Sequence, residues 1–104
     1  GLEHGTQTRW FASGAVQAVT EWHHGDRTGI VRSWHENGTL AEEVPYEAYK
    51  RHGVARTWYE SGALRTETEY RLGYRHGTQR KYKENGEVEF EFDWTIGKKI
   101  EYGR

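Results

Sequence analysis

A chain of 104 residues fits one domain, and 30% charged against 34% hydrophobic residues excludes a deep two-layer core. The 14% of aromatic residues, with 5 Trp and 7 Tyr, favours a folded but thin protein over a disordered one. The lack of cysteine excludes disulfides and thiolate metal sites, and a formal net charge of −1 excludes a global attraction to polyanions.

Four β-hairpins of one design are predicted along the chain. Each has a first strand, a three-residue turn that ends in glycine, and a second strand that ends in a large aromatic residue. In chain order the hairpins cover 6–22, 30–46, 54–70 and 78–94. Period-two alternation and a high content of β-branched and aromatic residues favour strand over helix, so the predicted fold class is all-β.

The hairpin recurs with a period of 24 residues. Glycines stand at 5, 29, 53 and 77, and again at 14, 38, 62 and 86. A period of this length indicates an array in which each unit contacts mainly its neighbours. We therefore predict one repeat domain, 1–104, with units at 5–28, 29–52, 53–76 and 77–100.

Two kinds of turn are expected. Ser-Gly or Asn-Gly ends the short turns, at Gly14, Gly38, Gly62 and Gly86, and these pairs suit the positive φ that primed hairpin turns need. The links between units, such as 71–77, are predicted to be wider glycine-rich turns.

Alternation along the second strands separates two faces of a sheet. One face is predicted to be apolar to aromatic, with residues such as Val44, Tyr46 and Tyr70, and to present aromatic rows. The other is predicted to be mostly acidic, with Glu43 and Glu67 among its residues. Arg9 and Lys81 of the first strands are assigned to the acidic face, where they can pair with the carboxylates. A single sheet with one apolar face needs a cover, which can be its own curl, another chain or a ligand.

The spacing of glycines and aromatics resembles a known repeat. The residues that carry the resemblance are Tyr70, Gly73, His76, Gly77, Tyr82 and Gly86. They resemble the MORN repeat (membrane occupation and recognition nexus), and the Glu-Asn-Gly or Glu-Ser-Gly turn followed by Leu resembles its bacterial variant. Departures are Tyr49 and Glu101, which stand where link glycines are expected.

The resemblance covers nearly the whole chain, as about four units. It implies tandem β-hairpins that form one elongated, twisted antiparallel sheet of about eight strands. It implies a non-enzymatic protein-interaction module or a membrane-proximal scaffold, and many small bacterial members look like antitoxin or immunity proteins.

No catalytic or metal site is expected. His4, His52 and His76 each precede a repeat glycine, which indicates a turn position, because residues one repeat apart lie too far apart to share an ion. The exposed carboxylates of the second strands are typical of a solvated face. No nucleophile elbow or phosphate loop occurs, so neither an enzyme nor a cofactor is predicted.

The candidate binding residues are aromatics and arginines at one position per repeat. They are Trp10, Trp34, Trp58, Tyr82, Arg32, Arg56 and Arg80. These residue types dominate protein-binding hot spots, although the aromatics can instead form the core with the arginines lying over them. Base stacking along a single nucleic-acid strand is a third reading, and the near-zero net charge argues against it.

We therefore predict a non-enzymatic protein-binding module, an antitoxin or immunity protein in its most concrete form, with a toxin as partner and a cytoplasmic location. The alternative is a membrane-proximal scaffold that binds phospholipid. Self-association through open sheet edges is a further option. No apolar stretch has transmembrane length. Because the chain starts at Gly1 and contains no methionine, we expect it to be a processed or excised piece.

Overall fold

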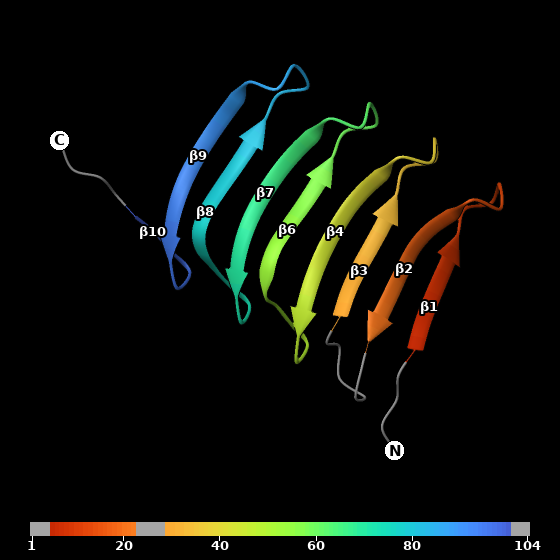
Figure 1. The fold of residues 1–104 in the computed structure, drawn as a ribbon, viewed down its shortest axis with the longest axis horizontal. Helices are drawn as coiled ribbons and strands as arrows, with labels where there is room; N and C mark the ends of the chain where they lie inside the picture. The colour runs from red at the N-terminus through yellow and green to blue at the C-terminus, as the bar shows by residue number, and fades with distance from the viewer. Residues whose placement is uncertain (1–4, 23–28, 101–104) are drawn as a thin grey trace.

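The computed structural model describes residues 5–22 and 29–100, which form one antiparallel sheet. Hairpin follows hairpin from β1 at one end to β9 and β10 at the other (Figure 1). The strands are β1 (Gly5–Trp10), β2 (Val16–Trp22), β3 (Gly29–Trp34), β4 (Leu40–Glu47), β5 (Lys50–Arg51), β6 (Gly53–Trp58), β7 (Leu64–Arg71), β8 (Tyr74–Tyr82), β9 (Val88–Thr95) and β10 (Lys98–Lys99). The molecule measures 52 × 36 × 14 Å, so it is one layer thick.

The prediction of an all-β, elongated sheet of tandem hairpins is confirmed, but with ten strands rather than eight. The short β10 adds one strand, and a break at His52 separates β5 from β6. The physical reason for the break is Pro45 of the neighbouring β4, which has no N–H to donate to the ladder. Glu69 holds the same place one repeat later, and there β8 is continuous. The boundaries of the four units stay a prediction.

The short turns differ from the predicted primed type. In the second hairpin the Gly38 N–H donates to the His35 carbonyl and the His35 N–H donates to the Thr39 carbonyl, both at 2.9 Å. Among these turn residues only the glycine is left-handed, with φ 92° for Gly38. The prediction was therefore wrong, because this pattern is a three-residue loop in which glycine forms a bulge after an ordinary turn.

The primed geometry occurs at the links instead. Ala48 and Tyr49 have φ 49° and 69°, and they connect the paired residues Glu47 and Lys50. Two consecutive left-handed residues between paired strands are what a type I′ hairpin requires. The prediction of a wide link was wrong for the three links with turns at 48–49, 72–73 and 96–97, which share this tight turn. The first link, 23–28, lies outside the described residues. Tyr49, which stands where glycine was expected, adopts the left-handed conformation without it.

The repeat histidines support these links. His76 Nδ1 accepts a hydrogen bond from the backbone N–H of Ile96 at 3.2 Å, and His52 Nδ1 does the same for Leu72. Both donors are the first left-handed residue of a link turn. The predicted turn position is wrong for these histidines themselves, because His52 lies at the break between β5 and β6 and His76 lies within β8. Each instead holds the link turn of the next repeat, and His4 lies outside the described residues.

Replacing His76 by alanine is expected to lower the free energy of unfolding by about 1 kcal/mol, because the Ile96 N–H loses its acceptor. His76→Asn supplies a side-chain oxygen near the position of Nδ1 and should recover most of the loss. Urea denaturation followed by circular dichroism measures both. Equal losses in the two variants would contradict the role of Nδ1 as the acceptor.

Neighbouring repeats are also tied at the short-turn end. His35 Nε2 donates to the Trp58 carbonyl and Asn37 Nδ2 to the Glu60 carbonyl, both at 2.8 Å. One repeat later, Tyr59 Oη donates to the Tyr82 carbonyl at 2.7 Å. These bonds set the spacing of successive hairpins, and with it the spacing of every row of side chains on the sheet.

The core is thin, as the composition predicts. Within 5–22 and 29–100, only Val44 and Thr68 are buried, with 5% and 8% of their surface exposed. Val44 opposes Val31, and Thr68 opposes Ala55, so both lie in the middle rows of one face. Most other apolar side chains remain half-exposed, and the sheet carries no second layer among the described residues.

Candidate binding surfaces

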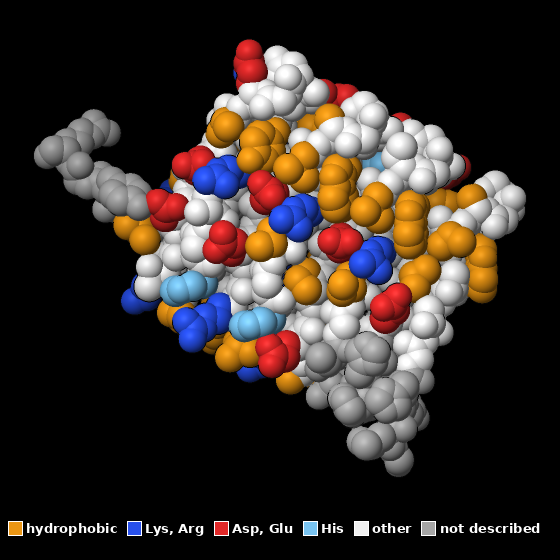
Figure 2. Space-filling view, viewed as in Figure 1, with side chains coloured by type: hydrophobic (Ala, Val, Ile, Leu, Met, Phe, Trp, Pro, Cys, Tyr) orange, Lys and Arg blue, Asp and Glu red, His pale blue; other side chains and the backbone are white. Residues whose placement is uncertain are grey.

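A ladder of alternating charges crosses one face of the sheet. Strand register places its residues directly opposite one another in the order Arg32, Glu43, Arg56, Glu67, Arg80, Glu91. Figure 2 shows this face, with a diagonal row of alternating basic and acidic side chains flanked by hydrophobic ones. We call it the charge-ladder face.

Each ladder arginine is paired. The Nε atoms of Arg32 and Arg56 lie 2.9 and 3.0 Å from the Oε2 atoms of Glu43 and Glu67, and Arg80 makes the same contact with Glu91. The hydrogen bond to Glu91 and the charge of its carboxylate raise the pKa of the Arg80 guanidinium above its ordinary value. The glutamate beside each ladder arginine balances the arginine's charge.

The aromatic candidates share the charge-ladder face. Trp34, Trp58 and Tyr82 follow the ladder arginines by two residues on the same strand, and alternation returns them to the same side. The Tyr82 hydroxyl donates to Glu67 Oε1 at 3.2 Å. Trp10 occupies the matching position in β1, where 61% of its surface is exposed.

This arrangement corrects the predicted separation into an aromatic and an acidic face. The strand-two alternation is right, but the first-strand aromatics stand with the carboxylates rather than with Val44 and Tyr70. A register shift between Ser33 and Trp34, repeated in each hairpin, sets Trp34 opposite Leu40. Such bulges are not visible in the alternation of one strand.

Arg9 and Lys81 are also placed differently from the prediction. Arg9 opposes Ala18, and Lys81 opposes Phe90, so both belong by register to the opposite face. The Lys81 amine nevertheless lies 3.1 Å from Glu89. The partners of the ladder carboxylates are Arg32, Arg56 and Arg80, which the sequence had grouped with the aromatics.

The opposite face holds a row of basic and aromatic residues that the sequence analysis missed. Register pairs Tyr46 with Arg51, Tyr70 with Arg75, and Trp94 with Lys99. The Arg51 guanidinium carbon lies 5.3 Å from the Tyr70 ring centroid, and that of Arg75 lies 4.6 Å from the Trp94 centroid. We call these residues the cation–aromatic row. Its signal in the sequence is the 24-residue spacing of basic residues at 51, 75 and 99.

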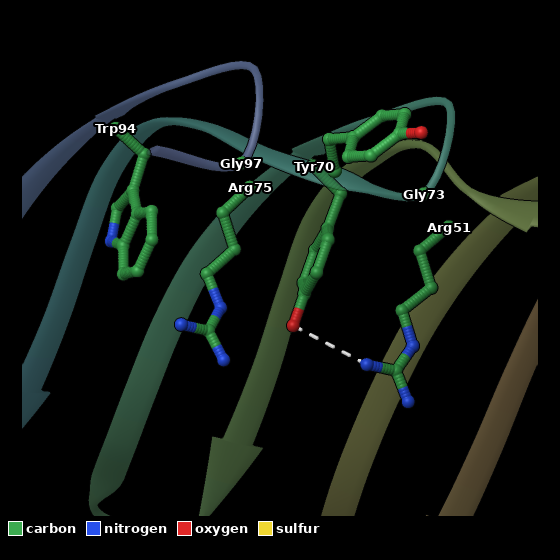
Figure 3. A pocket seen from close by; sticks show the side chains of 7 residues that line it. Arg51, Tyr70, Gly73, Arg75, Trp94 and Gly97 are labelled. Atoms are coloured by element: carbon green, nitrogen blue, oxygen red, sulfur yellow. Dashed lines mark hydrogen bonds between the residues drawn. The ribbon is translucent and has the colours of Figure 1, made fainter. Parts of the chain in front are cut away.

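Four residues of the cation–aromatic row line a groove of about 290 Å³, namely Arg51, Tyr70, Arg75 and Trp94. Figure 3 shows Arg75 between Trp94 and Tyr70, and Arg51 on the other side of Tyr70, with both guanidinium groups pointing the same way. Arg51 Nη1 donates to the Tyr70 hydroxyl at 3.3 Å. Hydrogen bonding to Tyr46, above all, raises the pKa of Arg51 above its ordinary value. Within the described chain, neither arginine forms an ion pair with a carboxylate.

The part of the chain that the structure describes contains no group of three or more His, Asp or Glu side chains arranged to hold a metal ion. It also contains no helix of the length and hydropathy needed to span a membrane.

Comparison with known families agrees with the hairpin geometry. The family model for the MORN repeat variant matches residues 27–48, 51–71 and 75–94, more than half of the chain. The chain belongs to the MORN repeat variant family. No curated protein and no solved structure matches it. The three matched repeats correspond to the second, third and fourth hairpins, and β1 and β2 form a further hairpin of the same design.

Members of this family are generally non-catalytic binding scaffolds.

Proposed function

We propose that this MORN repeat protein is a non-enzymatic protein-binding module whose charge-ladder face meets a partner protein. The observation that carries the proposal is a broad face with half-exposed Trp and Tyr beside paired Arg and Glu. Trp, Tyr and Arg are the residues most enriched in binding hot spots. The sheet measures 52 × 36 Å, so the area of this face is larger than the roughly 800 Å² that a standard interface buries on each partner.

The charge pattern favours a protein partner over a polyanion. Nucleic acids and anionic lipids attract surfaces with unbalanced positive charge. On the charge-ladder face each of the three ladder arginines is balanced by a glutamate at close range. Alternating charges suit a partner with a complementary alternating pattern, which gives specificity more than affinity.

The most concrete form of this proposal is an antitoxin or immunity protein that neutralises a toxin in the cytoplasm. Its support is the resemblance of the Glu-Asn-Gly and Glu-Ser-Gly turns to bacterial members of the family. Affinity capture from the native host followed by mass spectrometry would identify the partner, and this form requires the partner to be a toxin that the bound chain inactivates.

Arg56→Ala is expected to weaken binding to the captured partner by tenfold or more, since truncated hot-spot arginines cost about 2 kcal/mol or more. Its effect on stability should stay below about 1 kcal/mol, because the pair with Glu67 is partly exposed. Arg9→Ala, on the opposite face and outside the cation–aromatic row, is the control and should bind normally. Titration calorimetry measures the affinity of both variants. Unchanged affinity in Arg56→Ala would contradict a role of the ladder arginines in partner binding.

A second candidate, a membrane-proximal scaffold, has one observation in its favour. The link turns expose Leu72 and Ile96, at 46% and 49% of their surface, next to Arg71 and Lys98. Exposed apolar residues beside basic ones suit an anionic bilayer surface. Co-sedimentation with anionic vesicles that falls with added salt would favour this candidate over a protein partner.

A further inference from the structure

The cation–aromatic row provides a second recognition site, on the face opposite the one proposed for the partner protein. We propose that its groove binds an acidic peptide segment in the polyproline II conformation, with a carboxylate at every third residue. The inference concerns separate residues and stands independently of the proposed function.

The two arginines of the groove favour an anionic ligand. Arg51 and Arg75 point the same way from one face, and within residues 5–22 and 29–100 no carboxylate is paired with either. By contrast, Arg32, Arg56 and Arg80 are all paired on the other face. Two like charges held side by side without an acidic partner are stabilised by an external anion, and guanidinium binds carboxylate through two parallel hydrogen bonds.

The spacing selects how the anions are arranged. Arg51 and Arg75 are one repeat apart. Arg51 in β5 accepts a backbone hydrogen bond from Gly73 in the link after β7, and Arg75 in β8 pairs with Tyr70 of β7, so their backbones are separated by two strand spacings, about 9.5 Å. One carboxylate is too small to bridge that distance. A polyproline II helix advances about 9.3 Å per turn of three residues. Acidic side chains at i and i+3 of such a helix therefore match the spacing of the two arginines.

The aromatic walls fit the same ligand. Tyr70 and Trp94 separate the cations along the row, and Tyr74 also lines the groove with 56% of its surface exposed. Polyproline II segments dock on aromatic-lined grooves because their backbone is already ordered before binding. The volume of about 290 Å³ is at the lower end for ligand sites, which suits a few peptide side chains rather than a large cofactor.

The groove is shaped by the tight links described above. Gly97 approaches Tyr74 so closely that an added Cβ would lie 3.1 Å from the Tyr74 ring. Arg75 and Tyr74 stand directly after the link turn at Leu72 and Gly73. A wider link would carry the cations away from the aromatic residues they now oppose, so the type I′ turns are what forms the row.

The test is fluorescence anisotropy of two labelled peptides with four glutamates each, one with Glu-Pro-Pro repeats and one with Glu-Pro repeats. The intact chain should bind the Glu-Pro-Pro peptide at least tenfold more tightly. Equal binding of the two peptides would overturn the proposal, because charge without spacing would then suffice.

Variants locate the binding on the molecule. Arg51→Gln with Arg75→Gln should weaken binding of the Glu-Pro-Pro peptide at least tenfold. Arg65→Gln is the matched control, since Arg65 also lies over an aromatic ring, 5.6 Å from the Tyr59 centroid, but at the short-turn end. It should leave binding unchanged, and equal losses in both variants would contradict the site.

Two competitors distinguish other anions from the peptide. Inorganic phosphate at matched ionic strength should not displace the peptide, and vesicles of anionic lipid should not do so either. Displacement by phosphate or by vesicles would overturn the assignment to a peptide and assign the groove to phosphate groups or lipid headgroups. Circular dichroism of the double variant confirms that it remains folded, since both arginines are exposed.

Discussion

Replacing Gly53 by alanine is expected to lower the free energy of unfolding by about 2–4 kcal/mol. Gly53 has φ 110°, a conformation that costs an L-residue roughly 1–2 kcal/mol or more. An added Cβ would also lie 3.1 Å from Cγ of the Pro45 ring, which has little freedom to move. Gly53 starts β6 directly after the break beside Pro45, so the strain falls at the joint between two repeats.

Gly86→Ala is the matched control for this prediction. Gly86 has φ 93°, but an added Cβ would meet no atom within 4 Å. It should therefore cost only the conformational term, about 1–2 kcal/mol. Urea denaturation of the two variants measures the difference. If Gly86→Ala cost as much as Gly53→Ala, contact with Pro45 would play no part in stability.

Trp58→Ala is expected to cost about 2 kcal/mol of unfolding free energy. Full burial of tryptophan makes truncation cost about 3–5 kcal/mol, and Trp58 is only half-buried in the single layer. Trp10→Ala should cost less than about 1 kcal/mol, because Trp10 is 61% exposed at the same position of the first hairpin. Chemical denaturation followed by circular dichroism compares the two without relying on tryptophan fluorescence.

The comparison separates two roles for the aromatic row. If Trp58→Ala lowers the free energy of unfolding much more than Trp10→Ala does, packing within the array determines how much each ring contributes to stability. A small loss in both, together with loss of partner binding, would contradict the stability estimate and make Trp58 an interface anchor. The stability of a repeat array is nearly a sum of local terms. Trp58→Ala should therefore destabilise mainly the third hairpin and its neighbours.

The sequence predicts which residues form rows on the sheet, but it does not predict which residues of neighbouring strands pair. The 24-residue period identifies Trp34, Trp58 and Tyr82 as one row and Arg32, Arg56 and Arg80 as another. The period does not show that Glu43 and Glu67 pair with these arginines, because the pairing depends on the register between strands. The cation–aromatic row was missed for a similar reason, since it joins residues on both sides of a link whose length was overestimated.

The sequence by itself determined that this protein is an all-β array of hairpins, because alternation within a strand and glycine at fixed intervals are local signals. It also placed the two strand-two faces correctly. Only the tertiary structure decided which first-strand residues share a face with the carboxylates, because a bulge in each hairpin shifts the register. It likewise decided that Arg51 and Arg75 lie in step with Tyr70 and Trp94. That arrangement arises from two-residue links between neighbouring strands, whose geometry depends on contacts with the next repeat.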